Sequence, residues 1–402
     1  MGSLADSLEE LARIGAAGDG GVTRTAWTPE LFAAYDWVAG RMRAVGLAVE
    51  VDPAGNLVGR WEAGEGKAVA VGSHLDTVPS GGRLDGALGV LAGVHAVAHL
   101  REQGFEPARP VWVIAFMDEE GPRFGASFFG SRAFSGDDLG SYLGRCDAAG
   151  TTVAEAMRER GFDSAHTGAA ARIDEVSAYI ELHIEQGPVL EAQGRAIGVV
   201  TSIVGLRGYR ARLRGQANHA GTTPMAMRRD AFVGAARVAL ELRDFARSRP
   251  DVTANVGRVI VSPGASNVVP GLVEFTIDTR SVDPETVREL GRLVPDVAGR
   301  IAREEGLELE LEVTSSVEPL QLDQGLQRLI EDAASTEGAS TLRLPSGAGH
   351  DGLILGRHVP AAMIFVPSRG GISHSPDEYS TPEQIELGMR VLAGTIARVS
   401  RT

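Results

Sequence analysis

Residues 71–79 read VGSHLDTVP, a stretch in which an apolar run gives way to a polar loop. The run from Ala68 to Gly72 has the length of a buried strand, and the apolar stretch from Gly86 to Leu100 has the length of a buried helix. Asp85 stands directly before this helix, at the position of an N-cap residue. The order of strand, polar loop and helix is typical of a parallel β-sheet covered by helices.

Three further apolar runs enter polar loops in the same way, at residues 111–117, 178–182 and 361–366. Repetition of this pattern predicts an α/β fold with a mostly parallel sheet and helices on both of its faces. In such sheets, ligands bind beyond the carboxyl ends of the strands. Polar side chains in the four loops should therefore meet at one edge of the sheet.

The middle of the chain has a different pattern. Its strand-like and helix-like segments follow one another in the order βαββαβ, at residues 209–214, 229–247, 254–261, 272–280, 284–305 and 307–314. This order predicts a ferredoxin-like domain inserted into a larger one. We therefore expect a larger domain in two parts, residues 1–203 and 317–402, interrupted by a ferredoxin-like insert at residues 204–316.

Composition excludes several classes of protein. The chain has 402 residues, 43% of them hydrophobic, and a formal net charge of -14 with no basic run, which argues against a nucleic-acid partner. No apolar stretch is long enough to span a membrane, and the acidic start does not read as a signal peptide. Cys146 is the only cysteine, which excludes an intrachain disulfide and a multi-thiolate zinc site and fits a reducing cytoplasm.

The four loops carry residue types that bind metals. Imidazoles and carboxylates suit Zn2+ or Mn2+, and a carboxylate can bridge two ions through its two oxygens. Each residue alone has an ordinary alternative, such as a strand end, a helix cap or a solvated acidic turn. Their shared placement after strands favours a two-metal site. The expected ligands are His74, Asp85, Glu120, His183 and His374.

Two further acids lie beside these ligands. Asp76 follows His74 by two residues, and a metal-binding imidazole usually donates its second N–H to a carboxylate, so Asp76 is expected to orient His74. Glu119 directly precedes Glu120, and successive side chains of an extended chain point in opposite directions. Glu120 can therefore bind a metal while Glu119 acts as a general base, an arrangement suited to hydrolysis.

Other polar residues are less specific. His95 and His99 are four residues apart in the expected helix but have no acid between them, so we interpret both as ordinary helix residues. His350 stands between a glycine and an aspartate, and a role in lining the site is left open. In the insert, His219 could donate to a developing oxyanion, and Arg280 could bind a substrate carboxylate. The alternative for Arg280 is an exposed polar sheet face.

These segments resemble the M20 metallopeptidase superfamily and, within it, the amidase branch of N-carbamoyl-L-amino acid hydrolases, allantoate amidohydrolases and β-ureidopropionases. The resemblance covers nearly the whole chain. Its most discriminating residue is His183 in HIEQGP, residues 183–188, because the peptidase branches have a carboxylate at this ligand position. The segment HAGTTPM at residues 219–225 also resembles the amidase branch.

The resemblance implies how the residues share their roles. One ion would bind to His74, Asp85 and His183, and the other to Asp85, Glu120 and His374. The ions would be Zn2+ or Mn2+, with Co2+ and Ni2+ left open.

The resemblance also implies that Glu119 is the base, and Asp76 and His219 are expected to be catalytic residues with it. Pro122 and Arg369 depart from the common patterns of the family, which leaves their effect on the pocket open. The implied substrate contacts are Gln186, His219, Asn267, Arg280, Gly370 and Gly371.

The implied reaction is hydrolysis of the ureido C–N bond of an N-carbamoyl-L-α-amino acid to amino acid, ammonia and carbon dioxide. Glu119 would take a proton from water and return it to the leaving nitrogen. Allantoate amidohydrolase remains an alternative, as do a di-zinc aminopeptidase or N-acyl deacylase, against which His183 counts, and a catalytically inactive binding protein. The insert is implied to be a lid and dimerisation domain of a homodimer, with His219 serving its own or the partner's site.

Overall fold

The structure is a computed structural model that describes residues 2–401. Contacts between residues divide the chain into two compact units. Unit 1 runs to Thr201 and resumes at Leu322, and unit 2 spans Ser202–Gln321. Within residues 2–401, no helix is both long enough and apolar enough to cross a membrane.

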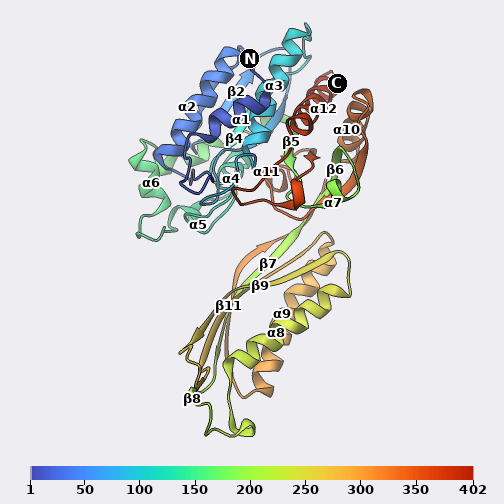
Figure 1. Ribbon diagram of the computed structural model, residues 1–402. Helices are drawn as coiled ribbons and strands as arrows, with labels where there is room; N and C mark the ends of the chain where they lie inside the picture. Colours follow the sequence, from blue (N-terminus) through green and yellow to red (C-terminus); the bar gives the residue numbers. More distant parts are fainter. Residues whose placement is uncertain (1, 402) are drawn as a thin grey trace. The chain divides into compact units, whose positions relative to one another are not determined.

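Most of a nine-stranded sheet belongs to unit 1 and forms its framework (Figure 1). The strands of this sheet are β1 (Ala48–Val51), β2 (Leu57–Trp61), β3 (Ala68–His74), β4 (Val111–Phe116), β5 (Val176–Ile184), β6 (Ile197–Ile203), β13 (Leu320–Gln321), β14 (Thr341–Ser346) and β15 (Ala361–Val366). The four middle strands, in the order β4, β3, β5 and β15, are parallel to one another. The pairings of β1 with β2, β2 with β4, β15 with β6 and β6 with β13 are antiparallel. The prediction of a mostly parallel central sheet is therefore confirmed, and antiparallel strands flank it.

Helices cover both faces of this sheet. One layer contains α1 (Leu4–Ala12), α2 (Pro29–Ala44), α3 (Ala87–Glu102), α10 (Gln324–Thr336) and α12 (Pro382–Val399), and the other contains α4 (Phe129–Ser135) and α11 (Asp351–Leu355). Adjacent residues of β4 point to opposite layers: Val113 meets α3, whereas Trp112 and Phe116 contact Phe134 of α4. The short helices α5 (Gly140–Leu143), α6 (Val153–Glu159) and α7 (Val189–Ala192) lie in the connections.

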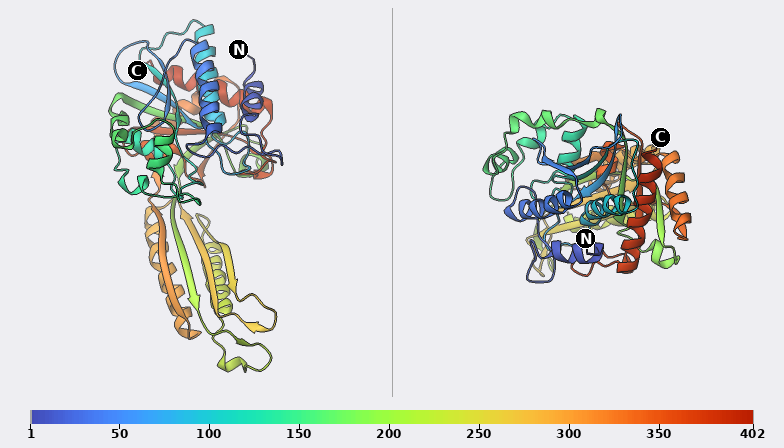
Figure 2. Two further views of the ribbon diagram at one scale, coloured as in Figure 1. Left: turned by 90° about the vertical axis from the view of Figure 1, so that its left-hand side faces the viewer. Right: turned by 90° about the horizontal axis from the view of Figure 1, so that it is seen from above.

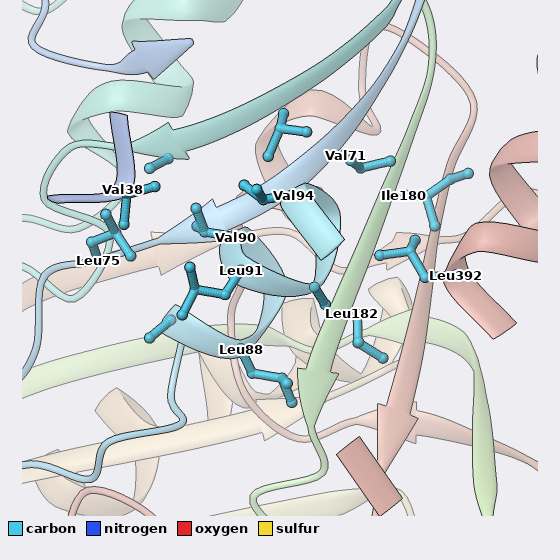
Figure 3. Packing of buried hydrophobic residues seen from close by; sticks show 14 of the residues in the cluster. Val38, Val71, Leu75, Leu88, Val90, Leu91, Val94, Ile180, Leu182 and Leu392 are labelled. Atoms are coloured by element: carbon cyan, nitrogen blue, oxygen red, sulfur yellow. The ribbon is translucent and has the colours of Figure 1, made fainter. Parts of the chain in front are cut away.

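The largest buried cluster joins the sheet to α3 and α12 (Figure 3). Val71 and Ile180 from the sheet, Val90 and Val94 from α3 and Leu392 from α12 all belong to it. Burying one such side chain contributes about 1.5–3 kcal/mol. This packing fixes the middle strands, and with them the loops at their carboxyl ends.

The start of α3 differs from the expectation. Its N-cap residue is Gly86, with φ of 65°, and no side chain caps the helix. A Cβ atom at Gly86 would lie 2.4 Å from the ring of His74, so the close approach of this ring requires glycine there. Asp85 is therefore not the cap, and its carboxylate instead accepts a hydrogen bond from Gln186 Nε2 at 2.7 Å.

Unit 2 consists of a four-stranded antiparallel sheet in the order β12, β7, β11, β9, with two helices packed on it (Figure 2). A two-stranded ribbon, β8 with β10, follows the end of β7. Alternate residues of β11 are buried, which matches one face packed on helices and one open face. The elements are β7 (Gly205–Arg214), β8 (Asn218–His219), α8 (Ala231–Arg247), β9 (Val252–Ser262), β10 (Val268–Val269), β11 (Leu272–Ser281), α9 (Pro284–Glu304) and β12 (Glu308–Val317).

A buried histidine links α1 to α3. His95 is 8% exposed, and its Nε2 lies 3.0 Å from the hydroxyl of Ser7. Burial lowers the pKa of His95 to about 4, and the charge of Arg41 adds to this effect. Because an unfolded histidine has a pKa of about 6.5, only the unfolded chain binds this proton between the two values. Stability should therefore fall as the pH drops from about 6.5 towards 4.

We expect His95→Gln to remove this part of the acid sensitivity, worth at most about 1.4 kcal/mol per pH unit. Urea unfolding of metal-free protein between pH 4.5 and 7 measures it. The control is His99→Gln, a half-buried histidine on the same helix, which should leave the pH dependence unchanged. Equal pH dependence in wild type and His95→Gln would contradict the assignment.

Candidate metal centre

The residues expected to bind metal lie at the carboxyl ends of the middle strands of unit 1. His74 is the last residue of β3 and His183 is the last but one of β5. Glu120 follows β4, His374 follows β15, and Asp85 lies between β3 and α3. The five residues form two overlapping groups whose ligand atoms lie within 4.8 Å of one another: His74 with Asp85 and His183, and Asp85 with Glu120 and His374.

Asp85 is common to both groups. Its Oδ1 atom lies 3.5 Å from His74 Nε2 and 3.2 Å from His183 Nε2. Its Oδ2 atom lies 3.4 Å from His374 Nε2, and that nitrogen is 3.2 Å from Glu120 Oε1. Each oxygen of Asp85 therefore faces a different set of imidazoles, as a bridging carboxylate would.

These separations suit a pair of divalent ions. Two ligand atoms that share a tetrahedral Zn2+ ion at about 2.0–2.2 Å are about 3.4 Å apart. The four nitrogen–oxygen separations given above range from 3.2 to 3.5 Å. A donor set of imidazoles and carboxylates also suits Zn2+ or Mn2+.

The rings of two histidines are held by backbone carbonyls. His183 Nδ1 lies 2.9 Å from the carbonyl of Ile184, and His74 Nδ1 lies 3.0 Å from the carbonyl of Asp76. A carbonyl can only accept a hydrogen bond, so Nδ1 carries a proton in both rings. Nε2 is then the nitrogen that can bind a metal, and it is the one that faces Asp85.

The carboxylate of Asp76 has a different role from the one expected. Its Oδ1 atom is 3.9 Å from His74 Nδ1, beyond hydrogen-bond distance, because the Asp76 carbonyl takes that proton. The carboxylate instead accepts the backbone N–H groups of Glu119 and Glu120 at 3.3 and 3.1 Å. Asp76 therefore ties the β3 loop to the β4 loop.

Glu119 lies beside the two groups. Its side chain is buried, and its Oε2 atom is 3.7 Å from His74 Nε2. Burial raises the pKa of Glu119 well above its usual value, and the charge of Glu120 adds to this effect against the opposing pull of His74. A carboxyl group with a raised pKa suits a general base at neutral pH.

The imidazoles act as counter-ions of Asp85. Burial would raise the pKa of Asp85, but hydrogen bonds from three histidines hold it well below its usual value. Asp85 and Glu120 in turn raise the pKa of His374 to about 10. Metal binding to these groups must therefore release protons.

Backbone strain is concentrated near the centre. Within residues 2–401, six non-glycine residues have positive φ, and three of them, Asp118, Gln186 and His374, lie at the centre with φ of 55°, 57° and 55°. Such conformations cost about 1–3 kcal/mol each and persist where the surroundings enforce them. The strain at Asp118 falls immediately before Glu119, and the strain at His374 falls on an expected ligand.

Three of the expected substrate contacts lie in unit 1. Gln186 Nε2 donates to Asp85 Oδ2 at 2.7 Å, and Gln186 Oε1 is buried with no hydrogen-bond partner among the described residues. The backbone N–H of Gly370 donates to the carboxylate of Glu191 at 2.7 Å. The N–H of Gly371 donates to a carbonyl of its own turn. In this state, both glycine donors have partners within the chain.

The other expected contacts lie in unit 2, whereas the metal groups lie entirely in unit 1. His219 Nδ1 accepts the backbone N–H of Gly221 at 3.0 Å. The carbonyl of Asn267 accepts the N–H of the residue that follows His219 at 2.9 Å. Arg280 Nε lies 2.8 Å from Asp278 Oδ1 on the open face of β11.

His350, left open by the sequence, packs behind the centre. It is 1% exposed, its Nε2 lies 2.8 Å from the hydroxyl of Ser346, and its ring centroid is 4.6 Å from that of His183. Glu181, His183 and His350 form a further group of possible ligands. His183 has only one nitrogen to offer, however, and Asp85 faces it. We therefore interpret His350 as a packing partner of His183.

The two departures from the family patterns, Pro122 and Arg369, are both exposed and belong to none of the ligand groups among the described residues. The guanidinium of Arg369 lies 4.3 Å from the ring centroid of Tyr379.

Arg24 and Glu378 are two of the buried charged residues for which the sequence indicated no role. Arg24 is 1% exposed and donates to the carbonyls of Leu75, at 2.8 Å, and Ile14, at 3.1 Å, so it supports the loop after His74. Glu378 lies four residues after His374 and is 2% exposed. Arg24 is a lone charge in a mainly uncharged segment, and Glu378 lies shortly after the expected ligand His374. The sequence offers no other signal for either residue.

Comparison with known proteins agrees with this geometry. Residues 70–398 match Peptidase family M20/M25/M40. The chain is 42% identical to the N-carbamoyl-L-amino acid amidohydrolase of Geobacillus stearothermophilus, over 98% of this chain and 97% of that protein. It is 37% identical to the allantoate amidohydrolase of Bacillus subtilis (strain 168), over 99% and 97% of the two chains.

Among solved structures, an amidase of the hydantoinase/carbamoylase family from Burkholderia multivorans has a TM-score of 0.91 with this chain. It is 38% identical, and the match covers 99% of this chain and 97% of that one. The extent of these matches confirms the resemblance found in the ligand loops. The chain therefore belongs to the M20/M25/M40 peptidase family, within the amidase branch that includes these amidohydrolases.

Proposed function

We propose that this protein is a metal-dependent amidohydrolase that cleaves the ureido C–N bond of N-carbamoyl-L-α-amino acids. The products are the amino acid, ammonia and carbon dioxide. The observation that carries the proposal is the carboxylate of Asp85, whose oxygens face separate sets of imidazoles beside the buried carboxyl group of Glu119. The N-carbamoyl-L-amino acid amidohydrolase that is 42% identical to this chain supports the choice of substrate.

In this proposal, one divalent ion binds to His74, Asp85 and His183, and a second binds to Asp85, Glu120 and His374. When bound, the ions supply Lewis-acid activation of the ureido carbonyl and of a water molecule. Zn2+ and Mn2+ are the ions that this donor set favours, and Co2+ or Ni2+ would also fit it.

Glu119 moves the proton. Its carboxylate takes a proton from the attacking water, and the same group then donates the proton to the leaving nitrogen. The carboxylate of Asp76 accepts the backbone N–H groups of Glu119 and Glu120, so it fixes the positions of the base and of the neighbouring metal ligand. His219 donates a hydrogen bond to the oxyanion that develops at the carbonyl.

The remaining residues bind the substrate. The Arg280 guanidinium matches a carboxylate in two-point geometry, and Asn267, Gly370 and Gly371 add donors. Arg280 Nε lies 2.8 Å from Asp278 Oδ1, and both side chains are partly exposed. Because a partly exposed ion pair contributes little free energy, replacing the carboxylate of Asp278 by that of a substrate costs little. Gln186 Oε1, buried and without a described partner, is an acceptor suited to a ureido N–H.

The proposal has an alternative substrate and a location. Allantoate is the alternative substrate, favoured by the 37% identical allantoate amidohydrolase. The single cysteine fits a cytoplasmic protein, as expected from the sequence.

We also propose that unit 2 mediates a homodimer. β9 is an edge strand, and it exposes Val259 and Ile260, while the adjacent α8 exposes Phe232 and Leu240, each by 39% or more. An unpaired edge strand beside exposed apolar side chains is suited to pairing with a second copy. The opposite edge strand, β12, is rich in glutamate, which disfavours such pairing.

The first test separates the base from the ligand. Fully loaded wild type should hold two ions per chain by elemental analysis. Glu119→Gln should keep both ions but lose activity by at least the ~10²–10⁴-fold typical of a general base. Glu120→Gln should instead lose metal. Metal loss in Glu119→Gln with retention in Glu120→Gln would mean that the two roles are reversed.

The second test concerns the substrate. We expect kcat/KM to be highest for N-carbamoyl-L-methionine in a panel with its D-enantiomer, N-carbamoyl-β-alanine and allantoate. Arg280→Ala should lower kcat/KM roughly 10- to 150-fold, because a charge-assisted hydrogen bond contributes about 1.5–3 kcal/mol. Arg210→Ala, which removes an exposed arginine of the same sheet paired with Glu312, is the matched control. Faster cleavage of allantoate would favour the alternative, and preferred cleavage of a dipeptide would contradict the amidase assignment.

The third test concerns assembly. Light scattering should give the mass of a dimer for wild type and of a monomer for the double variant Leu240→Glu, Ile260→Glu. The control is Val313→Glu, which adds one glutamate at an exposed apolar position of β12 and should leave the dimer intact. Mixing His219→Ala with Glu119→Gln protein then asks whether His219 serves the partner's site, because activity returns only in that case. A monomeric wild type would rule out the dimer.

A further inference from the structure

Glu378 is a buried carboxylate that the proposed reaction does not use. It lies four residues after His374 and is 2% exposed. Its Oε1 atom accepts the backbone N–H groups of Leu84 at 2.9 Å and Asp85 at 3.0 Å. No lysine, arginine or histidine nitrogen of the described residues is found within 4.0 Å of it, so these hydrogen bonds must compensate its burial.

The other oxygen of Glu378 reaches the second ligand loop. Oε2 lies 2.9 Å from the hydroxyl of Ser373, the residue before His374. The same hydroxyl lies 3.0 Å from Asp85 Oδ2, the oxygen that faces His374. One carboxylate thus joins the backbone of Asp85, the side chain of Asp85 and the chain next to His374.

The surroundings leave this carboxylate little freedom. A Cβ atom at Gly82 would lie 2.1 Å from Glu378, so the chain passes directly against the carboxyl group and only glycine fits. The loop of residues 82–85 is therefore packed on Glu378 as well as hydrogen-bonded to it.

From these contacts we infer that Glu378 is a positioning residue that fixes Asp85 between the two ligand groups and preferentially supports the ion bound by Glu120 and His374. The preference follows from the contacts. Glu378 supports Asp85, which both ions share, but through Ser373 it also supports the chain at His374, which only the second ion uses. This inference rests on the proposed two-metal site.

The test is a calorimetric titration of chelator-stripped, full-length protein with Zn2+. Glu378→Leu keeps the approximate size of the side chain but removes both acceptor oxygens, so the backbone N–H groups of Leu84 and Asp85 and the Ser373 hydroxyl lose this partner. We expect the Kd of the second ion to rise about 10- to 100-fold, the usual effect of removing an outer partner of a ligand, and the Kd of the first ion to rise by a smaller factor. His374→Ala, which removes a ligand of the second ion alone, identifies that ion in the titration.

Asp377→Asn is the matched control, because it removes an exposed negative charge one residue away. It should leave both Kd values unchanged. Thermal unfolding of the metal-free proteins checks that Glu378→Leu remains folded, and Ser373→Ala, at a half-buried hydroxyl, gives the same test if it does not. An unchanged Kd of the second ion, or an equal loss of both ions, would overturn the role of Glu378. Fewer than two ions in wild type would instead overturn the two-metal site itself.

Discussion

The carboxylate of Asp85 is the group on which the rest of this centre depends. Three imidazole nitrogens lie within 3.5 Å of its two oxygens, and they come from the ends of three neighbouring parallel strands or the loops that follow them. Only a parallel arrangement brings the ends of β3, β5 and β15 to one edge. The sheet, the helices packed on it and the glycine at position 86 all serve to hold one carboxylate among these rings.

This arrangement is costly in the absence of metal. Asp76, Asp85, Glu119 and Glu378 are all buried in unit 1, and burial by itself raises the pKa of each. Charged groups without compensation in an interior destabilise the fold. Here the negative charges are compensated by protonated imidazoles and by backbone N–H groups, which bond to Asp76 and Glu378. Divalent ions would replace the protons of the imidazoles. Metal binding to such a centre should therefore also stabilise the folded chain.

The sequence predicted the parts of this centre that depend on local pattern. The apolar runs predicted β3, β4, β5 and β15, and the ligand types in the following loops predicted a cluster, which the structure contains. It did not predict features that depend on tertiary contacts. Gly86, and not Asp85, is the N-cap of α3, because the ring of His74 packs directly against this position. The carbonyl of Asp76, and not its carboxylate, bonds to His74, because the carboxylate bonds to the backbone of the loop after β4. Glu378 was missed because its donors lie about 290 residues away in the chain.

The imidazole at position 183 also bears on the kind of substrate. A histidine ligand with its Nδ1 proton held by the Ile184 carbonyl binds a metal as a neutral group. A carboxylate at the same position would add one negative charge, whatever the charge of the remaining ligands. The centre of this protein is therefore one unit more positive than a centre with a carboxylate there. A more positive centre attracts an anion, and an N-carbamoyl amino acid carries a carboxylate but no compensating ammonium group. The same histidine that distinguishes the amidase branch thus favours an anionic ureido acid over a peptide with a charged amino terminus.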